Sequence, residues 1–571
     1  MIKTFLQRRY SHILSSLLLN NLFPTCKSCG IKLQHEFKDK PGYYRPPSLK
    51  NKIKKEDLVF NKYMSELSSE DQKLMTNSNE TNVIDYSDVV RKEKMENHRD
   101  KMNNLSCIRC RDANYQSSYQ GFKNREDYPI ESIDAILNQI PPNGNLVFII
   151  NAQDFPMSFN KEIFKYRNSN QIKFIITKND LLFPTKQLLD RYGLIFYRDY
   201  LYRSYKIPLE NIHVMSGLND WNIKQLTNFL PNESYLIGHV NSGKSTIIQS
   251  LLFAKEMEKK QLKNSKLERK LQKLQDISIN SYKSYRLMKK STKLIKSDIG
   301  PASSYMPGFT RGCIPYQLSN RLTIYDVPGF VNNPTFGHGI YDLIDPKLIK
   351  NINKGVKVYN LGIYKSHYDT IRNDQVYTIG GLFLLKAPTD HTMIQIRNCI
   401  NFNSTIFKDL AKTWDILSNL ESNPSLTNKF LFEPSKIPHY NKFIIPPFHG
   451  SIDLVFKNLG HINLKATGAK TPDPLIIYLP SNMEVIVRQP ITNFIMKTLS
   501  GRDVNGNPLR KENWVKKSII ELKRYTGSNF TSKLIPTSNQ KPNQSDLDFV
   551  KSYITYLNGN YDEDYMKNWI D

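Results

Sequence analysis

The sequence lacks any uninterrupted apolar run of about 20 residues, which is the length that a membrane-spanning helix requires. The apolar stretch around Leu17–Leu19 is much shorter than that. We therefore expect no transmembrane span, and any contact of this chain with a membrane would be peripheral.

Acidic residues are missing from the N-terminal segment, where the first carboxylate is Glu36. Lys3, Arg8 and Arg9 lie among several serines in that segment. This composition is typical of a mitochondrial transit peptide, and Arg8–Ser11 resembles a matrix-processing site. We predict that residues 1–20 are a transit peptide and that the protein acts in the mitochondrial matrix. The alternative is an ordinary basic N-terminal helix.

Negative charge is scarce in the chain as a whole. Its 571 residues carry 80 Lys and Arg against 53 Asp and Glu, a formal net charge of +27. This excess favours a polyanionic partner, either nucleic acid or an anionic membrane surface, although it could also belong to solvated faces of a basic organellar protein. The length predicts three or four folded units, and the hydrophobic content of 39% is sufficient to build their cores.

Cysteine is rare, and four of the six cysteines form two Cys-x-x-Cys pairs, Cys26 with Cys29 and Cys107 with Cys110. Two such pairs supply the four sulfur ligands of a tetrahedral zinc site. A disulfide is less compatible with the matrix, and a redox pair would need a βαβ context. We predict a zinc ribbon over residues 21–125, interrupted by a long polar loop. Cys313 and Cys399 are expected to be buried thiols.

A phosphate-binding loop is predicted at Gly238–Thr246, because an apolar strand precedes it and a helical segment follows it. Its glycines permit a tight path whose backbone N–H groups wrap phosphates. Lys244 would supply charge to the β- and γ-phosphates, and Ser245 would supply an oxygen to Mg²⁺. The predicted nucleotide contacts are Gly238, Asn241, Ser242, Gly243, Lys244, Ser245 and Thr246.

A second motif, Asp326–Gly329, follows the β-branched strand Arg321–Tyr325. Asp326 is expected to hold Mg²⁺ through water, and the Gly329 N–H to sense the γ-phosphate. Thr310, in a segment resembling a Pro-Gly-Thr-Thr switch, is the predicted second magnesium ligand. We predict that the catalytic residues of nucleotide hydrolysis are Lys244, Thr310, Gly329 and Asn241.

A third motif, Thr177–Asp180, ends the apolar strand Lys173–Ile176 and resembles a guanine reader. Asp180 would accept hydrogen bonds from the guanine N1 and exocyclic amine, and Lys178 would lie over the base. Thr177 replaces the usual Asn, which puts one loop-bracing hydrogen bond in doubt. Ser216 and Gly217 resemble the loop that backs the base.

The order of the motifs is unusual, because the guanine reader comes first rather than last. We therefore predict an α/β, circularly permuted Ras-like P-loop GTPase domain over residues 126–343. Phe330 stands where many GTPases have a water-orienting Gln. Asn241 stands where potassium-dependent GTPases coordinate a cation, or it braces the loop by a hydrogen bond. We expect slow hydrolysis without a partner and stimulation by K⁺.

The insertion at residues 255–297 is strongly basic and contains leucines at helical spacing. Its lysines could bind the phosphates of RNA, and its tyrosines could stack on the bases. An anionic lipid surface is the rival partner, since basic amphipathic helices also bind membranes. The third interpretation is a solvated helix without a partner.

Taken together, the Cys-x-x-Cys-Gly turn, Pro41–Tyr44, the second cysteine pair and the permuted motif order resemble the bacterial YqeH-type GTPases. They resemble more closely the fungal mitochondrial genetic interactor of prohibitins 3 family. The likeness extends to Gly380–Leu382, Phe402–Leu417, Asp453–Gly460 and Val485–Arg488. It implies a zinc ribbon, a permuted G domain, an RNA-contacting C-terminal α+β domain over residues 344–571, and a role in small-subunit assembly.

The expected function is therefore that of a mitochondrial GTPase, with GTP, Mg²⁺ and Zn²⁺ as cofactors and K⁺ as activator, acting on ribosomal RNA or a small-subunit precursor. One alternative is a GTPase at the inner membrane that affects lipid metabolism through prohibitin-linked pathways. The other is a nucleotide-binding module without turnover.

Overall fold

The computed structural model describes residues 25–44, 105–110, 130–260, 296, 300–491, 531–533 and 535–536, with short gaps in the first and in 300–491. The predicted transit peptide, most of the basic insertion and most of the polar loop between the cysteine pairs lie outside the described residues. The chain divides into two compact units, Met1–Gln116 and Ser117–Asp571.

The first unit is built around two cysteine-bearing turns. The Cys26 N–H donates to the Ile31 carbonyl and the Gly30 N–H to the Cys26 carbonyl, both at 2.8 Å. Gly30 has φ +75°, a conformation that glycine adopts without the strain of a Cβ. A short helical turn carries the second pair, over residues 108–110.

The second unit begins with a six-stranded sheet in the order β3-β2-β1-β4-β6-β5. All neighbouring strands pair in parallel except β5, which is antiparallel to β6. The strands are β1 (Asn145–Asn151), β2 (Lys173–Thr177), β3 (Ile212–Val214), β4 (Glu233–Gly238), β5 (Ile314–Gln317) and β6 (Thr323–Asp326).

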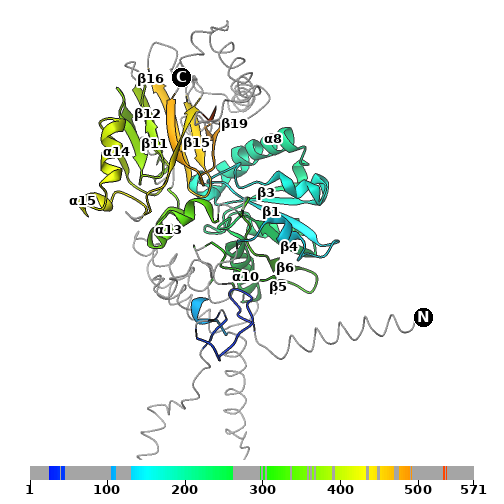
Figure 1. The fold of residues 1–571 in the computed structure, drawn as a ribbon. Coiled ribbons are helices and arrows are strands. Elements are labelled where there is room, and N and C mark those ends of the chain that lie inside the picture. The colour runs from blue at the N-terminus through cyan, green and yellow to red at the C-terminus, as the bar shows by residue number, and fades with distance from the viewer. Residues whose placement is uncertain are drawn as a thin grey trace, which may run out of the picture. The chain divides into compact units, whose positions relative to one another are not determined.

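The central strand β1 is apolar throughout its middle because both faces of the sheet are covered, as parallel sheets require. Phe148 and Ile150 belong to one buried cluster, with Tyr197 of helix α8 (Leu194–Tyr205). Val147 belongs to another, with Ile248 of helix α10 (Lys244–Lys260). Figure 1 shows this sheet in cyan to green, with α8 and α10 beside it.

The smaller elements of the same region connect these strands. They are α6 (Ile133–Leu137), η2 (Lys161–Lys165), η3 (Ser169–Gln171), η4 (Asn179–Leu181), α7 (Lys186–Leu188), η5 (Leu189–Gly193), η6 (Leu209–Asn211), α9 (Ile223–Phe229), η8 (Gly339–Asp342) and α13 (Pro346–Asn353).

The C-terminal half of the second unit is built mainly from two six-stranded antiparallel sheets, ordered β13-β10-β11-β17-β14-β20 and β19-β18-β15-β16-β12-β9. Their facing sides share one apolar core, in which the rings of Phe383 and Phe456 stack at 4.5 Å between centroids. Helix α14 (Leu410–Ser418) covers the outer face of the first sheet, where Leu417 packs with Leu384. Among the residues described in this half, strands outnumber helices. The expected α+β domain over residues 344–571 stays a prediction, because most residues after 491 lie outside the described ranges.

Neighbouring strands in each of these sheets run in opposite directions. The strands of this half are β7 (Tyr359–Asn360), β8 (Ile363–Tyr364), β9 (Asp369–Ile371), β10 (Val376–Ile379), β11 (Leu384–Lys386), β12 (Met393–Asn398), β13 (Ser404–Phe407), β14 (Tyr440–Ile445), β15 (Ser451–Phe456), β16 (Gly460–Thr467), β17 (Leu475–Pro480), β18 (Val485–Arg488), β19 (Thr531–Lys533) and β20 (Ile535–Pro536), with a further short helix α15 (Pro424–Thr427). Among the described residues, none of the helices combines the length and the apolar character needed to cross a bilayer.

Candidate functional site

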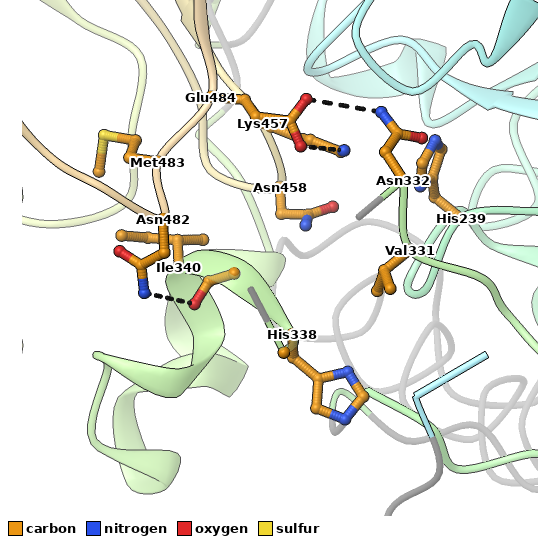
Figure 2. A pocket seen from close by; sticks show the side chains of 12 residues that line it. His239, Val331, Asn332, His338, Ile340, Lys457, Asn458, Asn482, Met483 and Glu484 are labelled. Atoms are coloured by element: carbon orange, nitrogen blue, oxygen red, sulfur yellow. Dashed lines mark hydrogen bonds and ion pairs between the residues drawn. The ribbon is translucent and has the colours of Figure 1, made fainter. Parts of the chain in front are cut away.

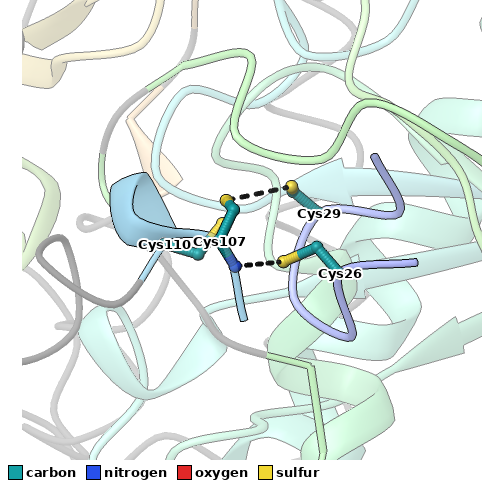
Figure 3. Close-up of side chains that lie close together, drawn as sticks. All are labelled: Cys26, Cys29, Cys107 and Cys110. Atoms are coloured by element: carbon teal, nitrogen blue, oxygen red, sulfur yellow. Dashed lines mark hydrogen bonds between the residues drawn. The ribbon is translucent and has the colours of Figure 1, made fainter. Parts of the chain in front are cut away.

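The four N-terminal cysteines lie together, as their spacing predicts. Their ligand atoms all fall within 4.8 Å of one another, and all four side chains are buried. The Cys29 and Cys107 sulfurs are 3.9 Å apart, and the Cys107 N–H donates to the Cys26 sulfur at 3.3 Å (Figure 3). A backbone N–H directed at sulfur stabilises a thiolate, so this donor set fits a tetrahedral metal such as zinc.

The two remaining cysteines differ from each other. Cys399 is buried, as expected, whereas Cys313 is exposed, so the prediction of a buried thiol at Cys313 is wrong. Cys313 immediately precedes the edge strand β5, on which residues alternate between half-buried and exposed positions.

The phosphate loop connects β4 directly to α10, the strand-loop-helix arrangement that the motif requires. Lys244 lies inside this loop, with its Nζ donating to the Gly238 and His239 carbonyls at 2.9 and 3.0 Å. Gly243 has φ +99°, and a Cβ at Gly238 would come within 2.7 Å of the Ile149 carbonyl oxygen. The two glycines therefore permit a path that other residues would obstruct.

Ser245 and Asp326, the two predicted magnesium residues, are in direct contact. The Ser245 hydroxyl donates to Asp326 Oδ2 at 2.9 Å. Burial raises the pKa of Asp326 to about 6, against the opposing effects of Lys244 and Ser245. Burial also lowers the pKa of Lys244 to about 8, against the effect of Asp326. A cation bound here would stabilise the buried carboxylate in its charged form.

Gly329 and Thr310 are the two other residues predicted to act at the phosphates. A Cβ at Gly329 would be 2.9 Å from Val240 Cα and 3.1 Å from Lys244 Nζ, so the Gly329 backbone lies against the phosphate loop. Thr310 is buried. The structure shows no hydrogen bond from Thr310 to Ser245 or Asp326 among the described residues, and its assignment as a magnesium ligand stays a prediction.

The guanine motif is fastened to the phosphate loop by Thr177. Its hydroxyl donates to the Ser242 carbonyl at 2.6 Å and also lies 3.2 Å from the Ile150 carbonyl. Thr177 stands where this motif usually has Asn. Its hydroxyl makes the loop-bracing hydrogen bond that this difference had put in doubt. Asn179, which sequence reasoning missed, bridges the Ile176 and Met215 carbonyls through its side-chain amide.

The predicted base-reading residues meet in the same place. Asp180 is buried and accepts a hydrogen bond from the Ser216 hydroxyl at 2.7 Å. Gly217 lies against α10, since a Cβ there would be 3.0 Å from Thr246 Cγ2. The Gly217 carbonyl accepts from Ser250 of the same helix at 2.8 Å. The base-backing loop is thus packed against the helix that follows the phosphate loop.

Lys178 has the left-handed conformation, with φ +57°, at the start of η4. Burial lowers its pKa, against the opposing charges of Asp154 and Asp180. Asp154 was not predicted from the sequence, because it follows β1 rather than any recognised motif.

Two predictions about turnover concern Asn241 and Phe330. Asn241 Nδ2 donates to the Tyr305 carbonyl at 2.8 Å, which is the loop-bracing alternative considered from the sequence. Coordination of K⁺ by Asn241 remains a prediction. Phe330 is fully buried and contacts the rings of Phe148 and His239. Its side chain therefore has a core role and offers no polar group to an attacking water.

The last described residue of the basic insertion, Lys296, is buried. Its Nζ donates to Asp220 Oδ1 at 2.5 Å, to the Gly217 carbonyl at 3.2 Å and to the Ser250 hydroxyl at 3.3 Å. Lys296 is therefore committed to the base-backing loop, and the prediction that the insertion contacts RNA or lipid falls on residues outside those described.

Comparison with known proteins identifies two matching family models. They are described as the N-terminal domain of genetic interactor of prohibitins 3, over residues 25–124, and its C-terminal domain, over residues 366–566. The first contains the cysteine cluster. The nucleotide motifs lie in the segment between the two models.

Three curated proteins named "Genetic interactor of prohibitins 3, mitochondrial" are similar along most of their length. The Debaryomyces hansenii protein is 47% identical over 549 residues, which cover 95% of this chain and 91% of the relative. The Scheffersomyces stipitis protein is 43% identical, with coverage of 95% and 88%. The Clavispora lusitaniae protein is 41% identical, also with coverage of 95% and 88%. These names confirm the mitochondrial location expected from the sequence.

Proposed function

Since the chain belongs to the genetic interactor of prohibitins 3 family, we propose that it is a mitochondrial GTPase of the circularly permuted Ras-like type. In this proposal it acts in assembly of the mitochondrial ribosome, on the small subunit and its RNA. The matrix is the compartment compatible with this activity.

The observation that best supports nucleotide binding is the meeting of three motifs at one edge of the parallel sheet. Thr177 contacts Ser242, Ser245 contacts Asp326, and Gly329 lies against Lys244. Ligands of open α/β sheets bind at the carboxyl ends of the strands, where all these residues lie. The strand order β3-β2-β1-β4-β6-β5 supports the permuted arrangement, since the strand before the phosphate loop is central although it is the fourth in sequence.

Different residues would bind the phosphates, the base and the magnesium ion of GTP. The loop N–H groups and Lys244 would bind the phosphates, and Asp180 would accept from the guanine N1 and exocyclic amine. Ser245, Asp326 and Thr310 would hold Mg²⁺, which when bound supplies charge neutralisation at the phosphates. Because Phe330 cannot orient water, turnover would be slow until a partner, or K⁺ near Asn241, supplies the missing charge.

The proposal of ribosome assembly is supported by charge and by the cysteine cluster. The excess of basic residues suits a polyanion, and the four buried cysteines would hold Zn²⁺ in a small unit that has little core of its own. Co-sedimentation of the protein with a small ribosomal subunit in gradients, with and without a GTP analogue, tests this part. Migration only in light fractions under both conditions would contradict it.

Asp180→Asn tests the nucleotide assignment most directly. The amide would present a donor where the carboxylate accepts, so preference should shift from guanine toward xanthine nucleotides. Equilibrium binding of fluorescent GDP and XDP measures the shift. Lys244→Ala should abolish binding of both, while Lys224→Ala, on the exposed surface of α9, is the control. Unchanged GDP binding by Asp180→Asn would contradict the assignment of the base-reading carboxylate.

Hydrolysis requires a separate measurement. Phosphate release by the wild-type protein should be slow and faster in K⁺ than in Na⁺. Binding of GTP without release in either salt would instead favour a module that does not turn over.

A second candidate function follows from the names of the relatives, which record a link to prohibitins. In this alternative the protein associates peripherally with the inner membrane and affects mitochondrial lipid metabolism. Recovery with carbonate-extractable membrane fractions, together with absence from ribosomal fractions, would favour it over the assembly role.

A further inference from the structure

The loop that follows strand β1 contacts the base-reading strand on one side. β1 and β2 pair in parallel up to Asn151 and Thr177, and the Ala152 N–H donates to the Thr177 carbonyl at 3.0 Å. Gln153 and Asp154 therefore leave the sheet directly beside the guanine motif. Burial lowers the pKa of Lys178 in this motif, and the negative charge of Asp154 opposes that shift.

The same loop contacts the turn between β15 and β16 on its other side. Gln153 Nε2 donates to the Leu459 carbonyl at 2.9 Å, and the Asn458 N–H donates to Asp154 Oδ2 at 2.9 Å. Both Gln153 and Asp154 are buried. A tight turn some 300 residues downstream in sequence thus supplies hydrogen-bond partners of this loop.

The turn has a shape that fits this contact. Asn458 has φ +65° and Gly460 φ +124°, and a Cβ at Gly460 would be 3.1 Å from Gln153 Nε2. Gly460 therefore permits both the backbone conformation and the approach of Gln153. Lys457, at the other side of the turn, pairs with Glu484 at 2.5 Å.

A second route joins the turn to the phosphate loop through Tyr341. Its buried hydroxyl lies 3.1 Å from the Asn458 carbonyl and 2.8 Å from Asn353 Oδ1, at the end of α13. The Tyr341 ring lies in the same buried cluster as Val240 of the phosphate loop. A phenol has one proton, so only one of the two acceptors can receive it at a time.

The turn also borders a small pocket, which Figure 2 shows. His239 of the phosphate loop and Asn332 lie on one side of a small pocket, and Lys457, Asn458 and Glu484 lie on the other. Asn332 Nδ2 donates to Glu484 Oε2 at 3.5 Å. The chain that follows Gly329 and the antiparallel sheets thus share one polar junction.

We propose that the Lys457–Gly460 turn couples the nucleotide site to the C-terminal sheets, with Asp154 and Tyr341 as its two positioning residues. This inference rests on the proposed function, because it assigns a regulatory output to the GTP site. The loop that carries Asp154 relates the turn to the base-reading strand, through the hydrogen bond from the Ala152 N–H to the Thr177 carbonyl. Tyr341 relates the turn to the phosphate loop, whose Val240 lies in the same buried cluster. Coupling between two sites is reciprocal, so nucleotide must alter the turn and a change at the turn must alter nucleotide affinity.

Hydrogen exchange of the full-length wild-type protein tests the first half of this reciprocity. A non-hydrolysable GTP analogue should slow exchange at residues 453–464 by about fivefold or more, the lower end of typical coupling factors. Exchange at α14, which packs on the far sheet, serves as the internal reference and should be unchanged. Binding of the analogue without any change at residues 453–464 would overturn the coupling but leave the proposed function standing.

Tyr341→Phe and Asp154→Asn test the second half. Each should weaken binding of the analogue by about fivefold and remove much of the nucleotide-dependent protection of the turn. The control is Tyr440→Phe, which also removes a hydroxyl that donates to a backbone carbonyl, that of Gly381, but lies in the C-terminal sheet. The proposal would be overturned if Tyr440→Phe weakened binding of the analogue as much as Tyr341→Phe and Asp154→Asn did, with matched melting temperatures for the three variants. If the wild-type protein binds no guanine nucleotide at all, the proposed function fails, and the coupling fails with it.

Discussion

Polar groups find their partners differently at the proposed nucleotide edge of the parallel sheet and in the interior of the antiparallel sheets. At the nucleotide edge the partners come from short motifs, such as Thr177 with the Ser242 carbonyl and Ser245 with Asp326. In the antiparallel sheets, Arg488 donates to Asp453 across neighbouring strands and to the Phe155 carbonyl, which is 333 residues distant in sequence. Local patterns can reveal the first kind of contact, whereas only the folded chain reveals the second.

The first unit extends this comparison to a region in which one buried cysteine cluster brings two distant segments together. We expect one zinc per chain by elemental analysis, and loss of both the metal and the folded unit in Cys29→Ser. Cys29→Ser should therefore lose more folding free energy than the other variants. In zinc-finger peptides metal binding and folding are the same equilibrium, worth about 10–16 kcal/mol.

Cys313→Ser is the matched control for this experiment, because Cys313 is exposed and outside the cluster. It should retain full zinc content and the wild-type melting behaviour. A metal-free wild-type protein with a stable N-terminal unit would contradict the zinc assignment.

Arg488→Met should strongly destabilise the antiparallel sheets. Asp453 is completely buried and would lose its guanidinium partner, although Asn463 still donates to it at 2.9 Å. Leaving a buried charge without its counter-ion costs about 3–5 kcal/mol. Chemical denaturation monitored by tryptophan fluorescence measures the loss.

The exposed pair Lys412–Asp415 provides the contrast, because breaking an ion pair at the surface costs at most about 1 kcal/mol. Lys412→Met should therefore change the free energy of unfolding little. If Arg488→Met proved as mild as Lys412→Met, the buried network would not hold the sheets together.

Apart from the control variants, Thr177→Val should have the smallest effect, and that effect should be confined to the phosphate loop. The side chains are nearly the same size, so the change removes the hydroxyl bond to Ser242 without opening a cavity. A single hydrogen bond is worth about 1 kcal/mol, so GDP affinity should fall by about fivefold. Thr227→Val is the control, since that hydroxyl bonds to the Ile223 carbonyl of its own helix. An unchanged dissociation constant would show that the bond does not organise the phosphate loop.

Much of the nucleotide edge could be predicted from the sequence. The strand before the phosphate loop, the position of Lys244 and the meeting of the cysteine pairs all follow from residue type and spacing. The roles assigned to Thr310 and Asn241 in hydrolysis stay predictions, because they concern contacts with groups outside the chain. The exposure of Cys313 was missed, since a lone cysteine is more often buried and no local pattern marks an edge position.

The contacts made by Asp154 and Tyr341 could not be predicted for a different reason. Both meet backbone groups of a turn more than 100 residues away, and a backbone N–H or carbonyl carries no signature in the sequence. Along the chain, the C-terminal region follows the proposed phosphate sensor, Gly329, directly. The structure adds a contact through space, from the base-reading side as well as from the phosphate loop.

Lys296 joins the C-terminal end of the basic insertion to the loop that is proposed to back the guanine base. The insertion leaves from α10 and returns at Lys296, which is clamped to Asp220 and to the Gly217 carbonyl. If the proposed function holds, binding of a large ligand to the insertion would therefore act, through Lys296, on the loop that is proposed to back the base.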